Sequence, residues 1–358
     1  MSFLSHLLEP PAYLKLPVFA LDISDRSFKY MQFEETERTR GVKKFGTGAI
    51  PEGLVASGVI TDTAKLAALL REALADKKFQ YVALALPEEK GFVRTIRMPQ
   101  IDPDEIREAV ALQLEEYVPL PPEDTSFAYH ILPEDDPTSM DVLIAAYPTP
   151  LITQYRDMVI KAGFTPVSLE IESQAVARAI IPAEKEKEAV LVVDIGLTRT
   201  SFLFAKNGYT QLTSTIPVGG KTIHEAIMKA LNVSEEKAEQ LKIQHGIGHT
   251  KEGAQVYEAL LPLITTVQNE IQRRIEYWRE KTRNETKNQK APELHHVYLC
   301  GREANLIGLP SHLFAQLHVP VTLPNVWVNA LPDKQFVPEI EFRDSLGYAT
   351  SIGLALGV

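Results

Sequence analysis

Two segments of one design lie about half the chain apart, and they constrain the fold more than any other feature. Residues 18–33 and 190–204 each contain a β-rich apolar run that ends in an aspartate, then a tight turn with hydroxyl side chains, then a second strand. A strand–turn–strand motif that recurs at half the chain length predicts two related halves that face one cleft.

Composition excludes several kinds of function. The chain has 358 residues, of which 45% are hydrophobic and 23% are charged, so it has enough apolar side chains for a sizeable core. Its net charge of -10 disfavours nucleic acid as a partner, because duplex binding needs clustered Lys and Arg, and it also disfavours binding to anionic lipid. Cys300 is the single cysteine, which rules out an intramolecular disulfide and a thiolate metal cluster.

The hydropathy pattern predicts no membrane span and no signal peptide. No run of 18 apolar residues is present. The first residues lack a basic region and a small-residue cleavage site. Phe3, Leu4, Leu7 and Leu8 fit one face of a short helix, which we expect to dock on its own domain or on a partner, with weak membrane contact as the alternative.

A block of distinct pattern lies between the two halves. After a buried strand at 79–86, the order strand, helix, strand, strand, helix is expected at 92–98, 102–118, 127–132, 141–146 and 151–162. Asp102 followed by Pro103 is typical of a helix start. The block is expected to form a small sheet with packed helices, inserted into the first half. In the second half, apolar residues from Ile264 to Trp278 predict a long amphipathic helix, with residues 279–290 as a loop or a frayed helix end.

The second turn carries the strongest chemical signal. Asp194 ends a strand and can hold water around Mg²⁺, while Gly196 allows a phosphate to approach the backbone. The hydroxyls of Thr198 and Thr200 can bind phosphate oxygens or order the turn. Gly219 and Gly220 precede an expected helix, whose N-terminal amides favour an anion. The alternative interpretation is an ordinary hairpin with a tight turn.

The order of these motifs resembles the PilM family of type IV pilus assembly proteins, which are actin-like relatives of FtsA. Residues 194–200 read D-I-G-L-T-R-T, residues 217–220 read P-V-G-G, and residues 235–242 are similar to the family's A-E-x-L-K. In the inserted block, residues 113–120 resemble E-x-Y-[IV]-P, and the chain ends in a similar G-L-A-L. The resemblance covers residues 18–357.

The resemblance implies an α/β, actin-like (ribonuclease H-like) fold of two lobes with an inserted SHS2-type α+β subdomain. It places the first lobe at residues 1–87 and 166–188, the inserted subdomain at 88–165 and the second lobe at 189–358, with a helical subdomain near 222–292. It implies an ATP site with Mg²⁺ held through water by Asp22 and Asp194. The other implied nucleotide contacts are Ser27, Lys29, Gly196, Thr198, Thr200, Gly219, Gly220, Glu239, Lys242, Gly301 and Asn305.

Two of the three nucleotide loops depart from the family pattern. The first turn has Ser24 and Asp25 where a glycine and a serine are typical, and a carboxylate about 4 Å from a phosphate costs about 4 kcal/mol at an effective dielectric near 20. Arg302 and Glu303 add bulk where glycines are typical. Glu170 or Glu172 could orient a water for attack on a γ-phosphate, although carboxylates at a helix start also explain them. We therefore expect weak ATP turnover at most.

The resemblance also implies a partner. PilM-like proteins bind the N-terminal cytoplasmic peptide of a PilN-type bitopic protein, in a groove expected between the inserted subdomain and the first lobe. Candidate lining residues are Phe92, Arg94, Ile96, Gln113, Glu116 and Tyr117. The protein is expected in the cytoplasm, held peripherally at the inner membrane by its partners among the pilus assembly proteins, with self-association left open.

Three functions remain as hypotheses. The first is an adaptor of pilus assembly in which a nucleotide acts as a conformational ligand. The second is an Mg²⁺-dependent ATPase or kinase of the actin and Hsp70 superfamily, which the altered loops disfavour. The third is an FtsA-like division protein, which the lack of a basic amphipathic stretch before Val358 disfavours.

Overall fold

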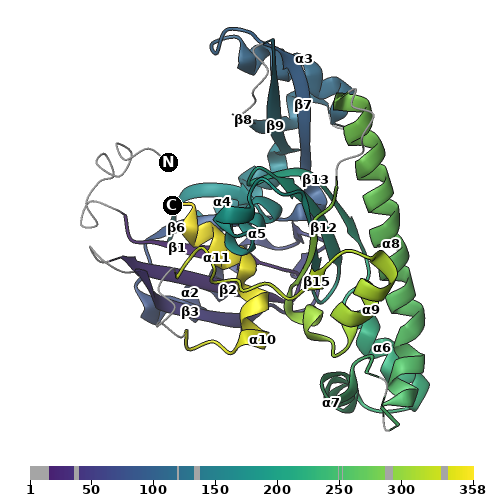
Figure 1. Ribbon diagram of the computed structural model, residues 1–358. Coiled ribbons are helices and arrows are strands. Elements are labelled where there is room, and N and C mark those ends of the chain that lie inside the picture. Colours follow the sequence, from purple (N-terminus) through teal and green to yellow (C-terminus); the bar gives the residue numbers. More distant parts are fainter. Residues whose placement is uncertain are drawn as a thin grey trace.

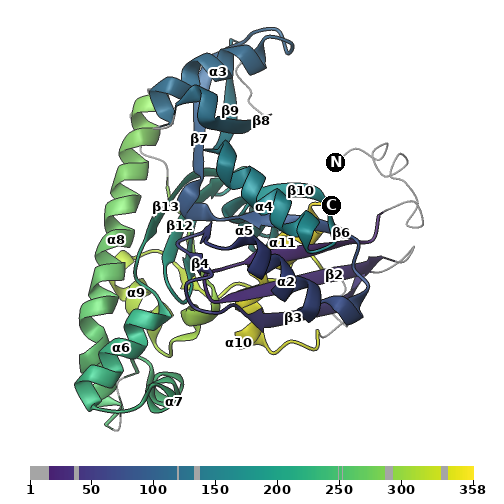
Figure 2. The same cartoon turned by 180° about the vertical axis from the view of Figure 1, so that it is seen from behind.

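A computed structural model describes residues 16–35, 40–118, 121–132, 138–248, 250–251, 253–286, 293–331 and 338–358. The chain forms two β-sheets that lie face to face, with helices between them and on their outer faces (Figures 1 and 2). The helix expected at Phe3–Leu8 falls outside the described residues. Within them, no helix is both long enough and apolar enough to cross a membrane.

The two sheets repeat one topology. The first has the order β3–β2–β1–β6–β10, and the second, of eight strands, contains the order β13–β12–β11–β14–β15, with antiparallel, antiparallel, parallel and parallel pairing in each. The first sheet comprises β1 (Val18–Ile23), β2 (Ser27–Glu35), β3 (Arg40–Ala49), β6 (Tyr81–Leu86) and β10 (Thr165–Ile171). The second comprises β11 (Val190–Ile195), β12 (Thr200–Lys206), β13 (Tyr209–Ile216), β14 (His296–Cys300) and β15 (Val321–Thr322). This confirms the two related halves predicted from the duplicated segments.

Alternating side chains on the strands build the layers. Phe19 and Leu21 of β1 face the outer helices α2 (Thr63–Ala73) and α4 (Thr149–Lys161), whereas Ala20 faces the interior between the sheets. Two helices fill that interior, α5 (Glu172–Ile180) and α11 (Ala349–Leu356). The outer face of the second sheet is covered by α6 (Gly220–Leu231), α8 (Ala254–Thr286) and α9 (Leu309–Leu317).

The inserted block extends the second sheet. Strands β7 (Phe92–Pro99), β9 (Ser139–Pro148) and β8 (Thr125–Ile131) continue the sheet beyond β13, and α3 (Ile106–Tyr117) packs on them around a core of its own. The junction is narrow, since β7 and β13 share one registered pair, Arg94 with Leu212. In both views α8 runs along the second sheet from α6 and α7 (Glu235–His245) to α3 (Figures 1 and 2).

One expected element boundary differs from the structure, and one open alternative is decided. Asp102 does not begin α3, because its carboxylate accepts a hydrogen bond from the Asp104 amide and its carbonyl accepts one from Glu105, which closes a separate turn. Of the two alternatives for residues 279–290, a loop or a helix end, the structure has the helix end, since α8 continues as far as Thr286. Trp278 stacks on Phe204 of β12, which fixes this part of α8 on the sheet and allows the polar turns beyond it to continue the helix.

Contact between α5 and α11 predicts the effect of one methyl group. A Cβ added at Gly353 of α11 would overlap the carbonyl oxygen of Ala175 in α5, which is fully buried. We expect Gly353→Ala to lower the free energy of unfolding by about 2 to 3 kcal/mol, measured by denaturant titration. Gly41→Ala is the control, because an added Cβ there meets nothing within 4 Å, and equal losses in both variants would contradict the packing described here.

Candidate functional site

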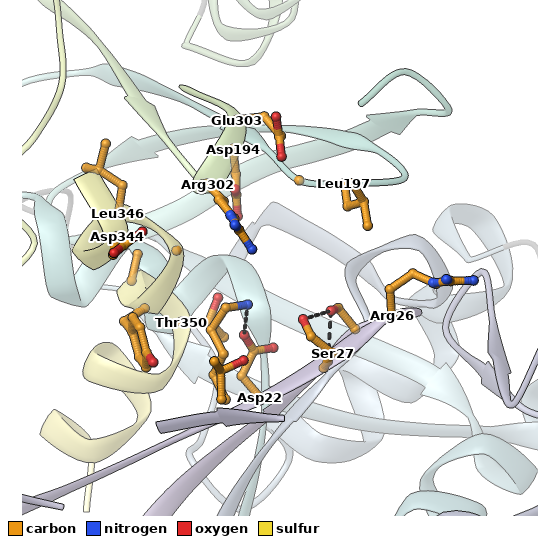
Figure 3. A pocket seen from close by; sticks show the side chains of 18 of the residues that line it. Asp22, Arg26, Ser27, Asp194, Leu197, Arg302, Glu303, Asp344, Leu346 and Thr350 are labelled. Carbon is orange, nitrogen blue, oxygen red and sulfur yellow. Dashed lines mark hydrogen bonds and ion pairs between the residues drawn. The ribbon is translucent and has the colours of Figure 1, made fainter. Parts of the chain in front are cut away.

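A cavity of about 1030 Å³ lies between the two sheets, where both duplicated turns open into it (Figure 3). We call it the cleft. Nine of the residues predicted from the sequence line it: Asp22, Ser27, Lys29, Glu172, Asp194, Gly196, Thr198, Glu239 and Gly301. The structure therefore brings together residues that lie far apart in the sequence, since Asp22 and Gly301 are separated by 279 positions.

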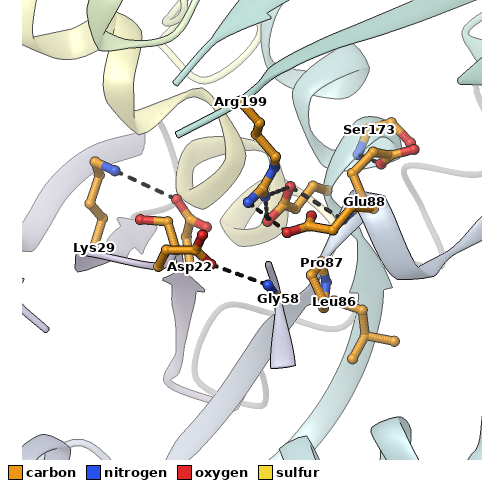
Figure 4. Close-up of polar contacts among 12 residues, drawn as sticks. Asp22, Lys29, Gly58, Leu86, Pro87, Glu88, Ser173 and Arg199 are labelled. Carbon is orange, nitrogen blue, oxygen red and sulfur yellow. Dashed lines mark hydrogen bonds and ion pairs between the residues drawn. The ribbon is translucent and has the colours of Figure 1, made fainter. Parts of the chain in front are cut away.

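Asp22 and Asp194 occupy equivalent places at the ends of β1 and β11. Burial raises the pKa of Asp22 to about 6, while Lys29, whose Nζ lies 3.9 Å from the carboxylate, lowers it in part (Figure 4). Burial also raises the pKa of Asp194 to about 6, with repulsion from Glu172 and Asp22 adding to the effect. A nearby cation would stabilise the ionised forms of these two carboxylates. The described residues, however, hold no group of three or more His, Cys, Asp or Glu side chains that could bind a metal ion.

Arg199, in the second turn, joins the two lobes. Its guanidinium lies 2.8 Å from Oε2 of Glu172 at the start of α5 and 3.0 Å from Oε1 of Glu89, which follows β6 (Figure 4). These three side chains, here called the Arg199 cluster, are each exposed by 15% or less. Burial opposes the charge of Arg199, but Glu172 and Glu89 outweigh it and raise the pKa of the guanidinium.

The amides at the start of α6 are already engaged. The amide of Gly220 donates to the Gly196 carbonyl at 3.0 Å, and that of Lys221 donates to the Leu197 carbonyl at 2.8 Å. The amide of Gly219 donates to the hydroxyl of Thr222. The two glycines are required for this packing, because a Cβ at Gly219 would lie 2.6 Å from the Gly196 oxygen. The expectation of free helix-start amides for an anion is therefore corrected.

A second ionic cluster fills the side of the cleft where adenosine contacts were expected. Lys242 contacts Glu303 at 2.7 Å, Glu239 at 2.6 Å and the His224 ring nitrogen at 2.9 Å. His224 also contacts Glu239. Partial burial opposes ionisation of Glu239, but Lys242 and His224 outweigh it and lower its pKa. The carboxylate of Glu303 lies against Gly220, where an added Cβ would overlap it. We call these four residues the Lys242 cluster.

The first turn is also closed by its own contacts. Asp25 accepts a hydrogen bond from the Gly58 amide at 3.1 Å (Figure 4). Ser24 donates its hydroxyl to the Ser27 carbonyl at 2.9 Å. Arg302 projects its guanidinium into the cleft from the second lobe (Figure 3). The turn thus presents side chains that are satisfied within the protein rather than a bare glycine backbone.

Six predicted residues do not line the cleft: Gly219, Gly220 and Lys242, whose contacts are given above, and Glu170, Thr200 and Asn305. Glu170 pairs with Arg178, which also donates to the Gly353 carbonyl, so this carboxylate ties α5 to α11. Thr200 is fully buried and donates to the Val218 carbonyl at 2.7 Å. Asn305 donates its amide to the Arg343 carbonyl at 2.6 Å and so holds α10 (Phe342–Ser345). Each of these polar groups completes a backbone or ionic contact of the fold, which local sequence does not reveal.

A second cavity of about 280 Å³, here called the groove, lies where β7, β9 and α3 meet β13 and α8. Of the six residues expected at a partner groove, Phe92 and Arg94 line this cavity, whereas Ile96 is buried in the core under α3. Gln113 and Glu116 are not among its lining residues, and the side chain of Tyr117 lies outside the described residues. The groove faces the second lobe through Leu212 to Thr215, rather than the first lobe as expected.

Sequence reasoning missed Arg199, Glu88 and Glu89. The signals for them were an arginine inside the turn 194–200 and two acids directly after the buried strand that ends at Leu86. Neither signal reveals the other, because the contact joins Arg199 to Glu89, which lies 110 positions earlier in the chain.

The repeated sheets, the cleft between them and the small inserted unit define an actin-like, two-lobed protein. A similar fold occurs in MreB5 of Spiroplasma citri bound to AMPPNP, with a TM-score of 0.57 and 13% identity over 95% of each chain. A segment of 95 residues, 26% of this chain, is 28% identical to the cell division protein FtsA of Bacillus subtilis. That match spans 22% of FtsA, about a fifth of its length.

A family model described as type IV pilus assembly protein PilM matches residues 20–358, and the chain belongs to this family. The structure of a PilM–PilN type IV pilus biogenesis complex is similar over 96% of this chain and 98% of that chain, with a TM-score of 0.78 and 25% identity. The predicted family and fold class are thereby confirmed.

The raised pKa of Asp194 predicts a pH dependence. A carboxyl whose pKa is higher in the folded than in the unfolded chain loses stability as pH rises through its titration, here from about 4 to about 6. Asp194→Asn removes this loss, so its unfolding free energy relative to wild type should rise by about 1 to 2 kcal/mol between pH 4 and pH 7. Denaturant titration at each pH measures it. A difference that stays constant with pH would contradict the assignment, and Asp157→Asn, at an exposed site, is the control.

Proposed function

We propose that this chain is an adaptor of type IV pilus assembly, positioned at the cytoplasmic face of the inner membrane by its partners. Its main partner would be the N-terminal cytoplasmic segment of a PilN-type bitopic protein. The observation that carries the proposal is the match in fold, over 96% of the chain, to a PilM–PilN complex. Other assembly proteins would gather on the same platform, formed by β7, β8, β9 and α3 beside the two lobes.

The groove fits an extended peptide by its shape and chemistry. Phe92, Val93 and Leu114 give it an apolar wall, and Thr213 to Thr215 lie along its other side. Because β7 and β13 share one registered pair at Arg94 and Leu212, backbone groups beyond that pair border the groove. An apolar trough beside strand edges supports recognition of an extended segment through backbone hydrogen bonds and alternate side chains.

Blocking the groove tests the proposal. We expect Thr215→Trp to weaken binding of the partner's N-terminal peptide more than tenfold, because an indole at this position fills a cavity of about 280 Å³. Isothermal titration with the full chain measures the dissociation constant. Leu112→Trp is the control, since Leu112 is 75% exposed and does not line the groove. Unchanged affinity in Thr215→Trp would refute the groove as the binding site.

We propose further that the cleft takes a nucleotide as a conformational ligand and not as a fuel. Its volume of about 1030 Å³ suits a nucleotide, and Lys29 and Arg302 supply positive charge. The rest of the donor set does not fit tight binding or turnover. The α6 amides donate to the second turn, Lys242 is neutralised by Glu239 and Glu303, and Glu172 is paired with Arg199. A paired Glu172 is a poor general base.

Phosphate release provides the test of the cleft. We expect turnover of Mg·ATP far below one per second, because the groups that would hold the phosphates and orient a water are engaged with each other. A coupled phosphate assay on the full chain measures the rate, and isothermal titration measures nucleotide affinity. Turnover above about one per second would instead favour the second candidate, an Mg²⁺-dependent ATPase of the actin superfamily. The observation that favours this second candidate is the pair of aspartates at strand ends, Asp22 and Asp194, which line the cleft with Lys29.

A further inference from the structure

The turn after β6 separates the groove from the cleft. Glu88 and Glu89 both line the groove, whereas Arg199, to which Glu89 is bound, lines the cleft. Glu89 uses one carboxylate oxygen, Oε1, for this contact. Glu88 uses Oε2 to accept the Ser173 amide at 3.0 Å at the start of α5 (Figure 4). One short segment therefore belongs to the walls of both cavities.

Polar atoms at this end of the groove lack partners. Among the described side chains, Oε2 of Glu89, Oε1 of Glu88 and the hydroxyl of Ser214 are buried without a hydrogen bond of good geometry. All three residues line the groove. A hydrogen bond from the Thr213 side chain to Glu88 favours the ionised form of that carboxyl and lowers its pKa in part. Buried acceptors that lack donors are costly, so a ligand that brings donors to this point gains their free energy.

The environment of the two carboxylates selects a cation as that ligand. Burial raises the pKa of Glu88 and of Glu89 to about 7 each, with repulsion from Glu172 adding to both and Arg199 lowering that of Glu89 in part. An ammonium or guanidinium group would stabilise the charged forms and supply the missing donors. The groove's own cations, Arg94 and Lys281, have contacts of their own.

We propose that Glu88 and Glu89 form an anionic subsite that binds a Lys or Arg side chain of the partner's N-terminal segment, in competition with Arg199 for Glu89. The proposal rests on the function proposed above and adds the chemistry of the residue that the groove recognises. Two cations that share one carboxylate are linked reciprocally, so a partner cation weakens the hold of Arg199, and removal of Arg199 strengthens the hold on the partner.

Peptide titration on the full chain tests both parts. The probes are the partner's N-terminal peptide and a series of variants of this peptide. In each variant, one Lys or Arg is replaced by norleucine. We expect one such replacement to weaken binding to wild type about tenfold, and Glu89→Gln to weaken binding of the parent peptide by a similar factor. Arg199→Met should strengthen binding three- to tenfold. Glu108→Gln, on the exposed side of α3, is the matched control and should change nothing.

The outcomes separate the two proposals. If no norleucine peptide binds more weakly than the parent, or if a segment without Lys and Arg binds with full affinity, the subsite is refuted even when Glu89→Gln fails to fold. If Thr215→Trp abolishes binding while Glu89→Gln and Arg199→Met leave it unchanged, the groove stands and the subsite is wrong. If the parent peptide does not bind wild type, both proposals fail together.

Discussion

The contact of Arg199 with Glu89 and Glu172 is the interaction on which the relation of the two lobes depends. It joins a turn of the second sheet to two elements of the first, and all three side chains are largely withdrawn from solvent. Removing one member of such a buried cluster leaves an uncompensated charge, which costs about 3 to 5 kcal/mol. Geometry at this point therefore fixes how closely the two sheets approach, and with it the shape of the cleft.

The cleft retains the outline of a nucleotide site while its polar groups are satisfied internally. Gly219 and Gly220 bring α6 against the second turn, and the carboxylate of Glu303 lies against Gly220. Glu303 belongs to the Lys242 cluster, so its carboxylate is already paired with Lys242. Any ligand must displace or match these contacts, so its binding free energy is reduced by the cost of breaking them. A site of this kind suits a conformational role better than repeated turnover.

The sequence was informative where structure is local and repeated. The two aspartate-ended strands predicted the duplicated sheets, and periodicity predicted the strands and helices of the inserted block. It failed where a side chain's role is set by a distant partner. Glu170 was expected in the cleft but pairs with Arg178, and Arg199 gave no local sign that its partners are Glu89 and Glu172. The start of α3 was also misplaced, because Asp102 closes a separate turn with Asp104 and Glu105.

The distance between the lobes tests the central claim most directly. Spin labels at two exposed positions, Glu72 of α2 and Lys229 of α6, report this distance by pulsed electron resonance on the full chain. We expect one narrow distribution without nucleotide, and a broader distribution centred at a longer distance in Arg199→Met. Arg273→Met, which removes a surface pair within α8, should leave the distribution as it is. An unchanged, narrow distribution in Arg199→Met would contradict the claim that the Arg199 cluster holds the lobes together.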